Sequence, residues 1–192
     1  MTNCIEIRGL VKQYKSFTLG PIDLKVPGGS IMGLIGENGA GKTTLIKSML
    51  GIVKPTAGTA VLLGADPDRA KEDIGMVLDD CFFSEYLRVR DVETVLCRVF
   101  KTWDKGLYRD YLDKFGLSGA KNIKELSRGM RMKLSLAAAL AHRPRLLLLD
   151  EATAGLDPVV RDEILDEFLA FVSDEDHAIL ISSHITSDLE KV

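Results

Sequence analysis

Residues 36–43 combine glycines with a lysine and a threonine in a pattern that can bind phosphate groups. The segment reads Gly-Glu-Asn-Gly-Ala-Gly-Lys-Thr and follows an apolar stretch, Ile31 to Ile35. Glycines let the backbone turn its N–H groups inward, so that they form an anion site at the start of the next helix. Lys42 is expected to reach the β- and γ-phosphates of a nucleotide, and the Thr43 hydroxyl to bind Mg²⁺. The complete motif between a strand and a helix favours this site over a plain glycine-rich turn. The residues predicted to contact the nucleotide here are Gly36, Glu37, Asn38, Gly39, Ala40, Gly41, Lys42, Thr43 and Thr44.

Two adjacent carboxylates, Asp150 and Glu151, follow the apolar run Leu146 to Leu149. A buried strand of this kind would carry them to its carboxyl end, where α/β sheets bind ligands. Asp150 is expected to hold Mg²⁺. Glu151 is placed to orient or deprotonate an attacking water, a role worth roughly 10²–10⁴ in rate. The alternative is that both residues only cap the end of a strand.

The elements that must position these residues alternate between short apolar stretches and longer amphipathic ones, which predicts an α/β domain. Strands are expected over Ile5–Leu10, Phe17–Val26, Ile31–Ile35, Ala60–Leu63, Ile74–Leu78, Leu146–Leu149 and Ala178–Ser182. Helices are expected over Lys42–Leu50, Arg128–His142 and Pro158–Val172. Between Tyr86 and Glu125 the apolar residues recur at helical spacing, in one set from Val89 to Phe100 and a second from Leu107 to Phe115. This pattern predicts a helical insertion in an α/β core.

The composition is that of a globular protein, with 46% hydrophobic residues and a net charge of −3. A dedicated nucleic-acid binder would usually be basic, so no nucleic-acid partner is expected. The three cysteines show no paired spacing, which favours a reducing, cytosolic compartment. No run approaches the ~20 apolar residues of a membrane-spanning helix. His142 and His177 have no motif around them and are expected at the surface.

The segment from Leu126 to Met130, Leu-Ser-Arg-Gly-Met, lies between the phosphate loop and the Asp150–Glu151 pair. This order resembles the ATP-binding cassette (ABC) ATPase family, and the match runs nearly the whole chain. The resemblance implies that two ATPases face each other head to tail, each ATP lying between the loop of one and the Leu-Ser-x-Gly segment of the other. Ser127 and Gly129 would then contact the γ-phosphate on a second copy or a paralogue. Ser127 also fits a simple helix cap, and the two interpretations are compatible.

Other positions take roles from the same resemblance. Tyr14 stands where the family stacks an aromatic ring on adenine, although it also fits a half-buried tyrosine at a strand end. His184 matches a histidine that contacts the γ-phosphate and completes the implied catalytic set, with Glu151 and Lys42. Residues 154–157 match a loop that crosses the dimer interface. The metal set implied for Mg²⁺ is Thr43, Asp79 and Asp150.

The chain departs from the family pattern at several positions. Asp79 stands where the family usually has glutamine, and an ionised carboxylate cannot donate a hydrogen bond to water. Arg128 and Met130 replace the commoner glycine and glutamine. Together with Trp103-Asp104 they look like the ATPases of a bacterial multidrug or antibiotic exporter subgroup. A fourth difference, Ala152 in place of proline, is expected to be minor.

The expected organisation is a single ABC ATPase domain over residues 1–192. Residues 1–85 and 126–192 would form a phosphate-loop NTPase core with a mixed sheet, flanking helices and an N-terminal antiparallel β region. Residues 86–125, approximately, would form the helical subdomain. The chain stops eight residues beyond His184, so the C-terminal strands that relatives carry are expected to be absent.

The implied function is that of an ATP-binding and ATP-hydrolysing subunit that powers a separate membrane permease, most simply for export. Such a subunit lies in the cytoplasm, on the inner face of the cell membrane. Phe82, Phe83 and Tyr86 either form the groove for the permease or belong to the core between subdomains. Two alternatives are a soluble ABC-type switch, whose usual coiled-coil or zinc insertions are not visible, and another phosphate-loop enzyme. The latter would not explain the Leu126–Gly129 segment.

Overall fold

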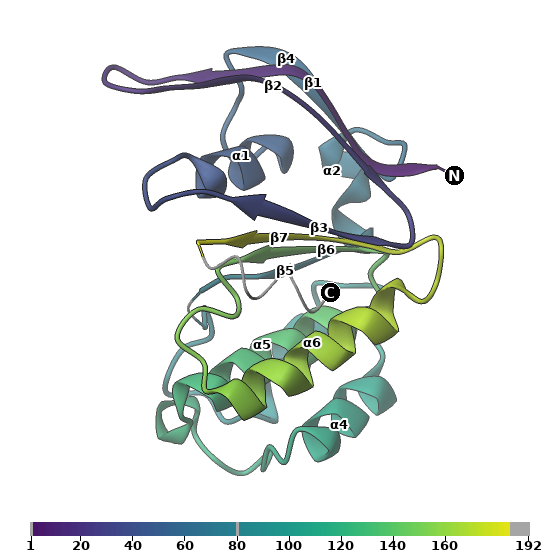
Figure 1. The fold of residues 1–192 in the computed structure, drawn as a ribbon. Coiled ribbons are helices and arrows are strands. Elements are labelled where there is room, and N and C mark those ends of the chain that lie inside the picture. The colour runs from purple at the N-terminus through teal and green to yellow at the C-terminus, as the bar shows by residue number, and fades with distance from the viewer. Residues whose placement is uncertain (1, 80, 185–192) are drawn as a thin grey trace.

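The computed structural model describes residues 2–79 and 81–184, which fold into two sheets with helices between and below them (Figure 1). Three antiparallel strands in the order β2-β1-β4 form the N-terminal sheet, and four parallel strands in the order β3-β7-β6-β5 form the second. Helix α1 lies between the two sheets, while α4, α5 and α6 lie on the other side of the parallel sheet. The predicted α/β class and the N-terminal antiparallel region are thereby confirmed.

The strands are β1 (Asn3–Gln13), β2 (Thr18–Pro27), β3 (Ser30–Ile35), β4 (Ala57–Leu62), β5 (Ile74–Val77), β6 (Leu146–Asp150) and β7 (Ala178–Ser183). The α-helices are α1 (Lys42–Met49), α2 (Pro67–Ala70), α3 (Asp91–Leu96), α4 (Lys105–Lys114), α5 (Arg128–Leu140) and α6 (Pro158–Val172), with short 3-10 turns at Lys71–Asp73 and Ile123–Glu125. Every strand and helix expected from the sequence is present, with shifted ends. Among the described residues, the short α2 and the two 3-10 turns are the elements that were not expected.

Strand β6 is buried on both faces and contributes to two hydrophobic cores of the described residues. Leu146 and Leu148 belong to the core that β6 shares with α1 and the antiparallel sheet. Leu147 and Leu149 belong to the core that it shares with α3, α4, α5 and α6. Alternate residues of a strand point to opposite faces, so an unbroken leucine run fits only a sheet that is covered on both sides.

The helices between residues 86 and 125 pack into the second of these cores. Val92, Leu96, Tyr108 and Leu112 are all buried there. Helix α4 begins at an N-cap in which the Asp104 carboxylate accepts a hydrogen bond from the Leu107 N–H at 2.9 Å. The first helix is shorter than the apolar spacing suggested. Val95 and Val99, which belong to the same periodic set, are 47% and 61% exposed. The division into a core and a helical subdomain stays a prediction.

His142 corrects the sequence-based expectation of a surface residue. Its side chain is buried, stacks on Phe100 with ring centroids 4.0 Å apart, and has Nδ1 3.2 Å from the Glu72 carbonyl oxygen. Burial lowers the pKa of His142, because charging the ring there would remove its hydration, although the contact with the Glu72 carbonyl raises it. His177 is partly buried and stacks on Phe171.

Within the described ranges, no helix is both long and apolar enough to cross a membrane.

Replacing Tyr108 with phenylalanine should destabilise the helical region without changing its shape. The fully buried Tyr108 hydroxyl donates a hydrogen bond to the Val89 carbonyl at 2.8 Å. Tyr108→Phe leaves that carbonyl without its partner, so urea unfolding should show a loss of about 1–2 kcal/mol in the free energy of unfolding. Tyr86→Phe is the matched control, because the Tyr86 side chain is exposed. Equal stability of the two variants would contradict the assignment.

Candidate active site

A cavity of about 330 Å³ lies over the phosphate loop at the carboxyl ends of the parallel strands. It brings together residues that are far apart in the chain, since Asp79 follows β5 and Glu151 follows β6. Its lining therefore includes residues of the phosphate loop, the carboxylate of Glu151, and Asp79, which is one of the positions at which the chain departs from the family pattern. The cavity is lined by Phe17, Asn38, Gly39, Gly41, Lys42, Thr43, Thr44, Asp79 and Glu151.

Glycine is required at position 41, where the loop turns into α1. Gly41 is the N-cap of α1 and has a φ of 97°, a left-handed conformation that residues with a side chain rarely adopt. A Cβ atom there would also lie 2.9 Å from Leu19 Cδ1 and 3.1 Å from Phe17 Cζ. The phosphate loop therefore packs directly against β2 and the turn before it, and this contact fixes the start of α1.

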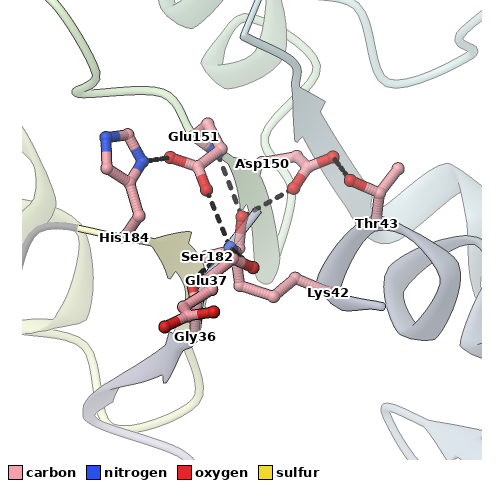
Figure 2. A network of polar contacts seen from close by, with 8 residues as sticks. All are labelled: Gly36, Glu37, Lys42, Thr43, Asp150, Glu151, Ser182 and His184. Atoms are coloured by element: carbon pink, nitrogen blue, oxygen red, sulfur yellow. Dashed lines mark hydrogen bonds and ion pairs between the residues drawn. The ribbon is translucent and has the colours of Figure 1, made fainter. Parts of the chain in front are cut away.

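The Asp150 carboxylate is buried and is held from two sides (Figure 2). Thr43 Oγ1 donates a hydrogen bond to Oδ2 at 2.7 Å, and Ser182 Oγ donates one to Oδ1 at 2.6 Å. Asp150 and Ser182 are direct partners in the β6–β7 register, so the sheet itself places the serine. Two hydroxyl donors satisfy a carboxylate that burial would otherwise disfavour.

Glu151 lies between two cationic or potentially cationic side chains, Lys42 and His184 (Figure 2). Its Oε1 is 3.1 Å from Lys42 Nζ, and its Oε2 is 2.5 Å from His184 Nδ1. Burial raises the pKa of Glu151, but the His184 hydrogen bond and the Lys42 ammonium together outweigh it and hold the pKa below its ordinary value. Lys42 Nζ also donates to the Gly36 and Glu37 carbonyl oxygens, at 2.6 and 3.1 Å.

The backbone of Glu151 is strained, with a φ of 54°. A left-handed conformation in a residue other than glycine costs about 1–3 kcal/mol and persists only where the surroundings enforce it. Here the Glu151 N–H donates to both Ser182 Oγ and the Ser182 carbonyl oxygen, each at 3.1 Å. The turn points the Glu151 carboxylate at Lys42 rather than along the line of β6 (Figure 2).

Two sets of predicted site residues lie apart from this cavity. Ser127 is the N-cap of α5, where its Oγ accepts a hydrogen bond from the Met130 N–H at 3.3 Å, so the expected cap is present. Ser127 and Gly129 do not line the cavity over the phosphate loop. Tyr14 follows β1, is 44% exposed and lies under the Lys12 ammonium; among the described residues, Phe17 rather than Tyr14 lines the cavity.

Sequence reasoning missed Ser182 and Phe17. A signal for Ser182 was available, because Ser182 and Ser183 end an otherwise apolar strand beside the strand that carries Asp150. Phe17 had no comparable signal, because its position at the cavity depends on how the β1–β2 turn meets Gly41.

Comparison with known proteins identifies the family. The family model described as "ABC transporter" matches residues 19–154. A bacitracin transport ATP-binding protein, BcrA of Enterococcus faecalis, is 37% identical over 203 residues, which cover 100% of this chain and 65% of the relative. A lantibiotic transport ATP-binding protein, SrtF of Streptococcus pyogenes, is 33% identical, covering 97% of this chain and 82% of the relative.

Solved structures show the same fold. A structure described as the ATP-binding subunit of an ABC transporter has a TM-score of 0.86 at 24% identity, covering 98% of this chain and 82% of the other. The chain spans about two thirds of the length of several curated relatives, for example 66% of the ABC transporter ATP-binding protein YtrB of Bacillus subtilis. Since the family model spans most of the sequence and includes both the phosphate loop and the Asp150–Glu151 pair, the chain belongs to the ABC transporter family and carries its ATP-binding domain.

Proposed function

We propose that the chain binds and hydrolyses ATP as the motor subunit of an exporter-type ABC transporter. The observation that carries the proposal is the convergence of Lys42, Thr43 and Glu151 at one cavity. Asp150 is hydrogen-bonded to Thr43, and His184 to Glu151. This set contains a phosphate-binding cation, a magnesium site and a carboxylate base. The names of the bacitracin and lantibiotic relatives support export as the direction of transport.

Lys42 has to exchange partners when ATP enters. In the nucleotide-free chain its ammonium is engaged by two carbonyl oxygens of the loop and by Glu151. A triphosphate offers several anionic oxygens, so it would draw the Lys42 ammonium away from Glu151. The pKa of Glu151 would then rise from its lowered value, and its carboxylate would be free to accept a proton from the attacking water. Binding of ATP would in this way release the base that the reaction needs.

The residues expected to hold Mg²⁺ fit that ion. Mg²⁺ prefers oxygen ligands, and Thr43 Oγ1 and Asp150 Oδ2 lie 2.7 Å apart at the cavity, which Asp79 also lines. When bound, Mg²⁺ would neutralise charge that develops on the β- and γ-phosphate oxygens. Asp79 offers a carboxylate where a glutamine amide is usual, and this favours metal binding over donation of a hydrogen bond to water.

The nucleotide cavity of one chain would be completed by a second ATP-binding chain. Ser127 and Gly129 lie at the start of α5, where the helix dipole and free N–H groups favour an anion. They are absent from the lining of the cavity over the chain's own phosphate loop. A head-to-tail dimer, of two copies or of two paralogues, would bring them to the γ-phosphate that the partner holds. Each chain would thereby supply half of each site.

The membrane partner would dock at a groove between β5, α3 and α5. A cavity of about 280 Å³ lies there and is lined mostly by apolar side chains, among them Phe82, Leu96 and Phe100. The 58% exposure of Phe82 supports the groove interpretation for this residue, whereas the burial of Phe83 supports the core interpretation for that one. The subunit would then lie on the cytoplasmic face of the membrane, against its permease.

Glu151→Gln should slow ATP hydrolysis while preserving ATP-dependent dimerisation. The amide cannot accept the proton of the attacking water, so turnover should fall roughly 10²- to 10⁴-fold. Phosphate-release assays measure turnover, and light scattering with MgATP measures the dimer. Glu175→Gln, at an exposed acid outside the cavity, is the matched control. A variant that is monomeric under all conditions would count against the head-to-tail dimer, and unchanged turnover would remove Glu151 from the mechanism.

The pH dependence of stability should report the Lys42–Glu151–His184 contacts in the nucleotide-free chain. Because the folded state lowers the pKa of Glu151, its contribution to stability is complete above the ordinary value of 4.5 and is lost as the pH falls through the lowered value. Wild type should therefore unfold at a higher urea concentration than Glu151→Gln at about pH 7, and this difference should narrow as the pH falls below 4.5 and through the lowered pKa. A gap that does not change with pH would contradict the ionised pairing.

Phe82→Asp should weaken retention of the permease and leave the fold intact. Phe82 lines the apolar groove and is largely exposed, so a charge there repels an apolar partner at little cost to stability. Ile52→Asp, at an exposed apolar residue outside the groove, is the control. Co-purification of the tagged chain with its membrane protein measures retention of the permease, and the melting temperature measures stability of the fold. Equal retention by the two variants would place the docking surface elsewhere.

A further inference from the structure

Ser182 is a fully buried serine near the end of an apolar strand. Strand β7 runs Ala-Ile-Leu-Ile before it reaches Ser182, and the Ser182 side chain is not accessible to solvent. A buried hydroxyl costs free energy unless hydrogen bonds replace the water that it loses. The catalytic set implied by the family resemblance includes His184, two residues further on, but not Ser182. The partners of this hydroxyl therefore indicate what it does.

The Ser182 hydroxyl both donates and accepts, and its two partners belong to two different residues of the site (Figure 2). Its oxygen lies 3.1 Å from the backbone nitrogen of Glu151, whose N–H can only donate, so the hydroxyl accepts this hydrogen bond. Its single proton is then directed to Asp150 Oδ1 at 2.6 Å, because an ionised carboxylate oxygen can only accept. The partners thus set the direction of both hydrogen bonds.

The hydrogen bond to Asp150 orients a carboxylate of the proposed Mg²⁺ site. Thr43 holds the other oxygen, Oδ2, from the first turn of α1 at 2.7 Å. Rotation of the carboxylate about the Cβ–Cγ bond of an aspartate meets only a low barrier, so donors on both oxygens are needed to fix it. Without the Ser182 hydroxyl, the Thr43 hydrogen bond would be left to orient a buried carboxylate. The orientation of Asp150 therefore depends on Ser182 as well as on Thr43.

The second hydrogen bond supports the strained turn that directs the Glu151 carboxylate. The φ of Glu151 is 54°, a conformation that persists only where the surroundings enforce it. The Glu151 N–H is shared between the hydroxyl and the carbonyl oxygen of Ser182, each at 3.1 Å. Removal of the hydroxyl would leave the N–H with the carbonyl oxygen. The turn that points the carboxylate at Lys42 would then be held less firmly.

We infer that Ser182 is a positioning residue, whose one hydroxyl orients the Asp150 carboxylate and supports the Glu151 turn. The proposed magnesium ligand and the proposed base are adjacent in the chain, and this hydroxyl keeps them in a fixed relation to each other. Sheet register provides the geometry, since Asp150 and Ser182 are direct partners in the β6–β7 pairing. Both hydrogen bonds belong to the nucleotide-free chain, and only their effect on turnover rests on the proposed ATPase function.

A double-mutant cycle in the nucleotide-free chain tests the hydrogen bond to Asp150. Ser182→Ala should raise the unfolding equilibrium constant roughly 10- to 100-fold, as expected for a hydrogen bond to a charged group. In an Asp150→Ala background the same change should have less than about a threefold effect, because the hydroxyl no longer meets a carboxylate.

Ser48→Ala is the matched control for this cycle. The Ser48 hydroxyl is buried in α1 and forms no hydrogen bond within residues 2–79 and 81–184. Its removal should therefore have the same effect in both backgrounds. Equal effects of Ser182→Ala with and without the Asp150 carboxylate would overturn the inference.

Kinetics of ATP hydrolysis test the positioning role. Ser182→Ala should lower kcat roughly 10- to 100-fold, the range for a residue that orients a metal ligand. The KM for ATP should stay nearly unchanged, because Ser182 does not line the nucleotide cavity. Ser182→Thr keeps the hydroxyl, so its kcat should stay within about threefold of wild type. Ser48→Ala should hydrolyse ATP at the wild-type rate.

Two kinetic results would overturn the positioning role. One is a folded Ser182→Ala variant with the kcat of wild type, which would make the hydroxyl important for stability alone. The other is a folded Ser182→Thr variant as slow as Ser182→Ala, and this result decides the matter even if Ser182→Ala does not fold. If wild type hydrolyses no ATP, the proposed function fails and the effect on turnover with it, whereas the unfolding cycle still decides the hydrogen bond.

Discussion

The site depends on how the fold accommodates the buried carboxylate of Asp150 at the end of an apolar strand. A carboxylate in such surroundings is costly unless donors surround it. The chain supplies one donor from the neighbouring strand, Ser182, and one from the first turn of α1, Thr43. These two hydrogen bonds join β6, β7 and α1 at one point. The phosphate loop, which begins where β3 ends, is therefore anchored to the strand that carries Asp150 and Glu151.

The sequence was sufficient for the parts of the site whose geometry is local. The phosphate loop is a contiguous segment whose conformation its own glycines permit, and the Asp150–Glu151 pair follows a run of four leucines that fits only a strand covered on both faces. Because both segments end at the carboxyl edge of a parallel sheet, their meeting at one cavity follows from the strand–loop–helix pattern. The helix cap at Ser127 is also local, because it needs only the serine hydroxyl and the backbone N–H three residues later.

The features that the sequence did not predict depend on contacts between distant segments. His142 is buried because Phe100, from the helical region, stacks on its ring and the Glu72 carbonyl meets its Nδ1. Periodicity placed Val95 in the same apolar set as Val92, but only Val92 faces the core. Phe82 and Phe83 are adjacent and chemically identical, yet one lines a groove and the other is buried. No local pattern distinguishes such pairs, because the direction of each side chain is set by the packing of α3 and α5.

The two halves of the proposed ATP site, one around Asp150 and Glu151 and the other around Ser127, are held in place by different contacts. The half around Asp150 and Glu151 is fixed by sheet register and by hydrogen bonds to buried strands. The half around Ser127 lies at the end of a helix and is positioned by packing, since a Cβ atom at Gly129 would lie 3.2 Å from Val160 Cγ1 in α6. Glycine at position 129 thus permits the close approach of α5 to α6. The orientation of the Ser127 segment depends on α6, which is connected to Glu151 through the 154–157 loop. In the proposed head-to-tail dimer, a shift of that loop would therefore move the Ser127 segment relative to the half around Asp150, which the β6–β7 register holds in place.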